Sequence, residues 1–251
     1  MGTGRTDPPV SWEGPTVGAT SNEDQDTYTS NTALYDAAHL IDGTDYVRRH
    51  TVAPSGCNDV VVIAPHGGRI EPGTSELCLA IAGQHPTNRA HATPGYAYWM
   101  FEGLRQADNA DLHVTSTHCD DPIAIALCRG ARHALSVHGC TPSSAGLSES
   151  ARAVLVGGRD QCLRLHLVEE LTETGFTVHD ASNHASLNGL DRRNIVNRTL
   201  LGQGAQLEIT APLREAMFTV HTVEDRAHNT TEVYWDFTRA VRNAIARRLG
   251  T

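Results

Sequence analysis

The sequence contains no lysine. All 20 basic side chains are arginine, and 29 acidic side chains give a formal net charge of -9 and a pI near 5.8. This acidic balance argues against a nucleic-acid partner and gives no reason to expect binding to an anionic membrane surface. The exclusive use of arginine reflects either coding bias or a preference for planar, two-pronged recognition of carboxylates.

Long apolar runs are also missing. No segment approaches the roughly 20 consecutive apolar residues of a membrane-spanning helix. The first residues, MGTGRTDPPVSWEGP, lack the apolar centre of a secretory signal peptide. We therefore expect no membrane partner, and a protein that is cytoplasmic or released on lysis.

The six cysteines form no CxxC pair, so we expect reduced thiols rather than a disulfide framework. Cys78 and Cys128 lie in apolar helical patterns, which favours small core residues.

A second compositional regime is absent, and 251 residues suffice for one substantial core. Residues 1–27 are rich in small and polar residues with almost nothing to bury. They predict a disordered lead-in that is dispensable for activity, followed by one domain over residues 28–251.

The most informative stretch is VVVIAPHGGRIEPGTSEL, from Val60 to Leu77. Its β-branched start predicts a strand buried on both faces, and the turn-rich residues after Pro65 predict a loop. A helix is expected from Ser75. In an open α/β sheet such a loop leaves the carboxyl end of a strand, where ligand sites are built, so His66 and Glu71 stand where chemistry is expected.

Strand and helix patterns alternate along the rest of the chain. They predict an α/β fold whose single sheet, mainly parallel or mixed, carries helices on both faces. We expect further strands near 45–54, 112–117, 133–137, 153–156, 176–179 and 205–210, and helices near 33–41, 96–107, 123–127, after residue 160 and over 232–249.

Three predicted strand ends carry histidine: His66 with Glu71, His118 with two aspartates, and His138. Two histidines and one carboxylate can hold zinc and leave a fourth position open for water. Glu208, on the polar face of a late strand, is the candidate for proton transfer. In the alternative interpretation these histidines are ordinary polar loop residues and Glu208 lies on a surface.

An ordered set of motifs resembles the phage-type poly-γ-glutamate hydrolase family, a compact relative of the zinc carboxypeptidases. The resemblance runs from about residue 28 to 214 and rests on HGGRIEPGTSEL, FEGLR, LHVTSTHCDDP, LSVHGC, VGGRD, NIVNR and GAQLEIT. It implies a carboxypeptidase-like fold, Zn²⁺ bound by His66, Glu71 and His138, and Glu208 as general base. It also implies that Asn197 and Arg198 hold a substrate carboxylate.

The chain departs from that family at Arg69, where the family often carries glycine. Arg69 either clamps an additional substrate carboxylate or points to solvent. Asp120 and Asp121 either orient a zinc-bound histidine or cap the helix that begins near Ile123.

These patterns lead us to expect a monomeric zinc hydrolase that cleaves the γ-glutamyl amide bonds of poly-γ-glutamate. Three alternatives stay open. They are a zinc amidohydrolase of another γ-glutamyl or acyl-amino-acid substrate, a non-catalytic binding protein on the same fold, and a cysteine hydrolase that uses Cys140.

Overall fold

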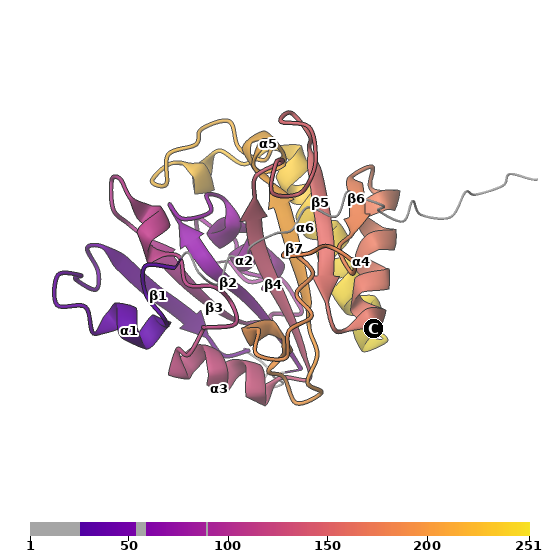
Figure 1. Cartoon of the computed structure of the whole chain (residues 1–251). Helices are drawn as coiled ribbons and strands as arrows, with labels where there is room; N and C mark the ends of the chain where they lie inside the picture. Colours follow the sequence, from indigo (N-terminus) through magenta and orange to yellow (C-terminus); the bar gives the residue numbers. More distant parts are fainter. Residues whose placement is uncertain (1–25, 54–58, 89) are drawn as a thin grey trace, which may run out of the picture.

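The strand β2 (Val60–Gly68) lies near the middle of a seven-stranded sheet, and all nine of its residues are buried. The computed structural model describes residues 26–53, 59–88 and 90–251 (Figure 1). The predicted lead-in falls outside this part as far as residue 25.

The strand order is β1-β3-β2-β4-β7-β5-β6. Neighbours are parallel except at two places, where β1 pairs antiparallel with β3 and β5 pairs antiparallel with β7. The expectation of a mainly parallel or mixed sheet is therefore confirmed as a mixed sheet. The other strands are β1 (Tyr46–Thr51), β3 (Ala97–Gly103), β4 (His133–Cys140), β5 (Ala153–Gly158), β6 (Thr177–Asp180) and β7 (Ala205–Thr210).

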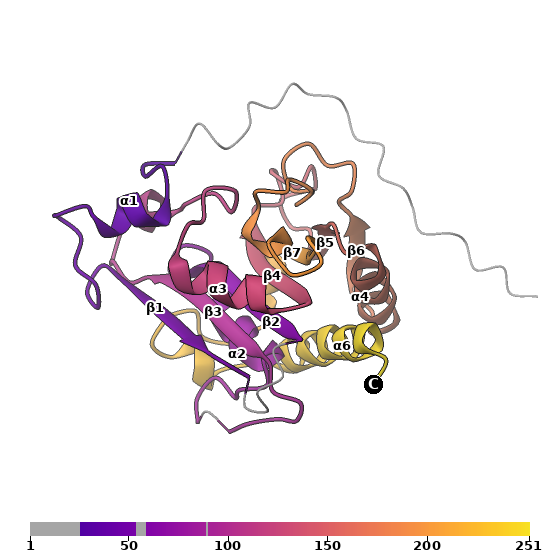
Figure 2. The same cartoon turned by 90° about the horizontal axis from the view of Figure 1, so that it is seen from below.

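Helices cover both faces of the sheet (Figure 2). On one face a large apolar cluster joins the sheet to α2 (Thr74–Ile81), α4 (Gln161–Glu173) and α6 (Glu232–Leu249). On the other face a second cluster joins it to α1 (Asn31–Tyr35), α3 (Pro122–Gly130) and the short helix η3 (Ile195–Asn197). The remaining helical segments are η2 (Asn109–Leu112), α5 (Ala211–Ala216) and η4 (Arg226–His228).

The prediction of a helix over residues 96–107 is wrong, because this segment forms β3. Its apolar side chains alternate between the two cores: Tyr98 and Met100 pack on one face, Trp99 and Phe101 on the other. A strand buried on both faces is apolar at every position, so its period of two is hidden. The aromatic content fits a strand.

The strand predicted over residues 112–117 is also wrong. Its start lies in η2, and the following residues form no strand. The backbone N–H of Thr115 donates to the carboxylate of Asp26 at 2.7 Å rather than to a neighbouring strand.

Five cysteines lie in the described part of the chain, and all five are free thiols. Cys78 and Cys128 are fully buried, as predicted. Among the described helices, none is both long enough and apolar enough to cross a bilayer.

Candidate metal centre and cavity

The loop after β2 folds back on itself and brings Glu71 beside His66. The N–H of Glu71 donates to the carbonyl O of His66 at 2.9 Å. A Cβ on Gly67 would collide with the Oγ of Ser75 and with the carbonyl O of Phe101. The two glycines of the HGG sequence therefore allow the end of β2 to lie against the start of α2 and the end of β3.

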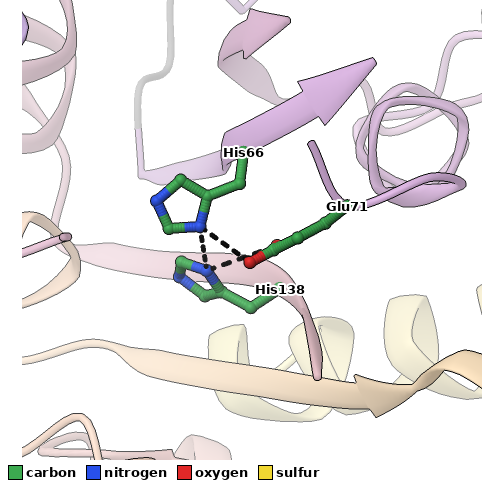
Figure 3. Close-up of side chains that lie close together, drawn as sticks. All are labelled: His66, Glu71 and His138. Atoms are coloured by element: carbon green, nitrogen blue, oxygen red, sulfur yellow. Dashed lines mark hydrogen bonds and ion pairs between the residues drawn. The ribbon is translucent and has the colours of Figure 1, made fainter. Parts of the chain in front are cut away.

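His66, Glu71 and His138 point toward one another, although His138 comes from the adjacent strand β4 (Figure 3). The Nδ1 atoms of the two histidines are 3.2 Å apart. The Nδ1 of His66 lies 2.9 Å from Glu71 Oε1, and that of His138 lies 3.8 Å from Glu71 Oε2. The three residues each offer one ligand atom within 4.8 Å of the others.

The opposite ring nitrogens are fixed by other groups. The Nε2 of His66 donates to the carbonyl O of Val114 at 2.9 Å, since a carbonyl can only accept. The Nε2 of His138 lies 2.7 Å from the Oγ of Ser136. The N–H of Gly139 donates to Glu71 Oε2 at 2.7 Å. A neutral His66 held in this way presents the Nδ1 lone pair to the cluster, as metal-binding histidines do.

This donor set fits a tetrahedral metal. Ligand atoms about 2.0–2.1 Å from a tetrahedral zinc ion are about 3.3 Å from one another. The two Nδ1 atoms, 3.2 Å apart, are close to that value, and each also lies near one oxygen of Glu71: 2.9 Å from His66 to Oε1 and 3.8 Å from His138 to Oε2. Two imidazole nitrogens and one carboxylate oxygen are the ligands of catalytic zinc sites.

Burial and mutual charge set the protonation of the cluster. For Glu71 burial opposes ionisation, but the charge and hydrogen bond of His66 outweigh it and lower the pKa to about 2. Burial lowers the pKa of His138 to about 3. For His66 burial also favours the neutral ring, yet the charge of Glu71 prevails and raises the pKa.

These pKa shifts predict that metal binding releases up to one proton per chain at a pH below the raised pKa of His66. At neutral pH Glu71 and His138 have no proton to lose, whereas His66 retains one below its raised pKa. We expect the apparent affinity to fall up to about tenfold per pH unit below that pKa. Isothermal titration in two buffers of different ionisation enthalpy measures the proton count, and a heat independent of the buffer would contradict the prediction.

The cluster opens into a cavity of about 750 Å³. Hydroxyl and amide groups dominate its polar lining, and none of the described residues that line it is arginine. The lining residues include Thr115, Ser116, Thr117, Thr141, Ser144, Ser186, Asn188, Asn194, Gln206 and Glu208.

Glu208 lines this cavity beside the cluster, because β7 pairs with β4 in a register that sets Glu208 opposite His138. Glu208 Oε1 accepts a hydrogen bond from the Nε2 of Gln206 at 3.0 Å. Burial and the charge of Glu71 raise the pKa of Glu208 well above its usual value. The prediction that Glu208 lies near the metal ligands agrees with this position, and the surface alternative does not, since the residue is buried.

The three residues predicted to bind substrate do not line the cavity. Asn197 is buried and its Nδ2 donates to the carbonyl O atoms of Gly189 and Asp191. Arg198 donates to carbonyl O atoms of the chain, among them that of Cys119 at 3.2 Å. Both side chains tie loops together in this structure.

Arg69 pairs with Glu224 at 2.6 Å and so contacts the loop before η4 rather than the cavity. This ion pair is partly exposed, which limits its contribution to stability to about 1 kcal/mol or less.

The loop that contains His118 and Asp121 has a structural role. Asp121 Oδ1 accepts from the N–H groups of Ile123 and Ala124, so its predicted role as a helix cap is confirmed. His118 does not line the cavity. Cys140 does, but burial raises the pKa of its thiol to about 12, which disfavours the cysteine-hydrolase alternative.

His113 and Asp26 also lie near the cluster, and no sequence pattern predicted either of them there. The ring of His113 lines the cavity and packs on the ring of His66, with 3.9 Å between centroids. The side chain of Asp26 accepts from His113 Nδ1 at 3.0 Å and lies within the predicted lead-in. Neither belongs to a metal-ligand pattern, and only the polar composition of HVTST hinted at a site there.

Comparison with known proteins gives consistent results. The profile of the family described as poly-gamma-glutamate hydrolase matches residues 28–240. The SPbeta prophage-derived UPF0714 protein YoqZ of Bacillus subtilis (strain 168) is 35% identical over 71% of the chain, and the match spans 58% of YoqZ. The UPF0714 protein YndL of the same organism is 31% identical over 80% of the chain and 71% of its own length.

Two solved structures share the fold. A bacteriophage poly-gamma-glutamate hydrolase has a TM-score of 0.77 and 30% identity, with 90% of this chain and 99% of that chain covered. A zinc-free form of YndL has a TM-score of 0.76 and 28% identity, with 89% and 98% covered.

Proposed function

Because the chain belongs to the poly-γ-glutamate hydrolase family, we propose that it hydrolyses γ-glutamyl amide bonds of poly-γ-glutamate in a zinc-dependent reaction. The proposal assigns zinc to His66, Glu71 and His138 and the role of general base to Glu208. The observation that carries it is the convergence of three ligand atoms beside a buried carboxyl group in one cavity.

Zinc, when bound, supplies a Lewis acid that polarises the amide carbonyl and activates water. Burial raises the pKa of Glu208, whereas the positive charge of a bound zinc ion would favour its ionised form. The ionised carboxylate accepts a proton from the attacking water and then delivers it to the leaving nitrogen. Val114 and Ser136 hold the rings of His66 and His138, and the N–H of Gly139 holds Glu71. These hydrogen bonds hold the three proposed ligands in position before substrate binds.

A substrate with one carboxylate per residue meets hydroxyl and amide donors in this cavity rather than guanidinium groups. The amide of Asn188 donates one N–H to the carbonyl O of His184, and its second N–H can hydrogen-bond a carboxylate without an ion pair. Under this proposal the abundance of arginine is unrelated to substrate binding, which agrees with the coding-bias interpretation.

The test compares the size distribution of purified poly-γ-glutamate after incubation with zinc-loaded protein, chelated protein and Glu208→Gln. We expect shortening by the zinc-loaded wild type alone. If wild-type protein with about one zinc per chain leaves the polymer intact, the substrate assignment fails and other γ-glutamyl or acyl-amino-acid amides become the candidates. A protein that takes up no zinc would instead support a binding protein on the same fold.

Gln206→Leu is expected to lower kcat about tenfold, the equivalent of one hydrogen bond of about 1.4 kcal/mol. Gln206 donates to Glu208 Oε1 and to the carbonyl O of Leu187, and its own oxygen accepts from Asn194. Its amide therefore fixes which oxygen of Glu208 is free. Steady-state kinetics with zinc content measured in parallel tests this, and an unchanged kcat at full zinc occupancy would speak against it.

A further inference from the structure

The buried carboxylate of Asp26 holds a segment that forms part of the cavity wall. Asp26 accepts from the N–H of Thr115 at 2.7 Å and lies 3.0 Å from His113 Nδ1 and 3.3 Å from His118 Nδ1. Its side chain is only 5% exposed. All three partners belong to the segment 113–118, which forms no helix or strand.

This segment contacts His66 at two points. The carbonyl O of Val114 accepts from His66 Nε2 and thereby sets which ring nitrogen faces the cluster. The ring of His113 packs on the ring of His66. Thr115, Ser116 and Thr117 continue the wall of the cavity. The position of the segment therefore determines the orientation of His66 and the shape of the cavity.

Asp26 is suited to hold three donors at once, because its carboxyl group is ionised. Burial favours the protonated form, but the hydrogen bonds of His113 and Thr115 outweigh it and lower the pKa of Asp26 to about 2. An ionised carboxylate accepts with both oxygens, and such charge-assisted hydrogen bonds are about twice as strong as neutral ones.

We propose that Asp26 is a positioning residue of the active site: it anchors the segment 113–118, which in turn orients the metal ligand His66 and shapes the substrate cavity. The inference rests on the metal site of the proposed function. It also moves the boundary of the dispensable lead-in, since a deletion that ends at residue 27 would remove this anchor.

The test measures zinc affinity and steady-state kinetics of full-length Asp26→Ala and Asp26→Asn. Residues that hold a metal-bound histidine in place are typically worth about 10–100-fold in metal affinity or activity. We expect Asp26→Ala to weaken zinc binding about tenfold or more and to lower kcat more than it raises KM. Asp26→Asn should lose less zinc affinity and less kcat, because its amide oxygen can still accept from the N–H of Thr115.

Asp120→Ala is the matched control. Its carboxylate accepts from the N–H of Thr32 at 2.8 Å and so also joins the N-terminal segment to the same region of the chain, away from the cavity. We expect its zinc affinity and kcat to stay within twofold of the wild type.

Wild-type zinc affinity and kcat in both Asp26 variants, or an equal loss in Asp120→Ala, would overturn the proposal. If Asp26→Ala does not fold, the zinc affinity and kcat of Asp26→Asn, compared with those of Asp120→Ala, test the proposal. Zinc affinity is measured without substrate, so a wild type that binds zinc but spares poly-γ-glutamate would refute the substrate assignment and leave the role of Asp26 testable by affinity.

Discussion

Glu208→Gln is expected to lower kcat by about 10²- to 10⁴-fold, the usual contribution of a positioned general base, while zinc content stays at that of the wild type. The amide keeps the shape of the side chain and can still accept from Gln206. It cannot take a proton from water. Because Glu208 is not one of the three clustered ligands, metal binding does not depend on it.

The same substitution should leave the fold intact. The pKa of Glu208 is raised in the folded protein, mainly by burial. Above the unfolded pKa of the carboxyl group, burying Glu208 therefore costs stability, and glutamine removes this cost. At neutral pH the metal-free variant should melt no lower than the wild type. Full activity in Glu208→Gln at equal zinc content would exclude Glu208 as the general base.

His138→Ala should abolish stoichiometric zinc binding and hydrolysis together. It removes one of the three proposed ligands, and the remaining two side chains supply too few ligand atoms for tight zinc binding. In wild-type protein zinc should raise Tm, because a ligand that binds only the folded state stabilises it. We expect this shift to vanish in the variant. Metal analysis after dialysis and thermal melts with and without zinc measure both effects.

His133→Ala provides the control for that experiment. His133 and His138 lie in the same strand, β4, and each is 4% exposed. His133 contacts Asp160, which caps α4, so its loss should lower Tm but leave the zinc-induced shift unchanged. A zinc-induced shift that survives in His138→Ala would exclude His138 as a ligand.

The sequence was most informative where the site is built from residues that are neighbours in the chain. Residues 60–77 form strand, loop and helix in the predicted order, but the strand continues past Pro65 to Gly68, so His66 lies in β2 rather than in the loop. His66, Glu71 and His138 could be selected because parallel neighbouring strands end at one edge of the sheet.

Contacts between distant segments have no local sequence signal. The segment 113–118 alternates like a strand, but an aspartate some 90 positions earlier takes its backbone donor. Arg198 follows Asn197 in a motif that resembles a carboxylate clamp, yet the fold directs its guanidinium to the carbonyl O atoms of Thr117 and Cys119. Both outcomes depend on tertiary positions that no local pattern encodes.

The order of the strands has a consequence for how the protein comes apart. The three proposed ligands and Glu208 lie on or directly after β2, β4 and β7, each of which has a partner strand on both sides, whereas β1 and β6 form the edges. Edge elements open locally at lower free energy than central ones. Fraying of β1 or β6 therefore leaves the three strands that carry His66, His138 and Glu208 paired with their neighbours.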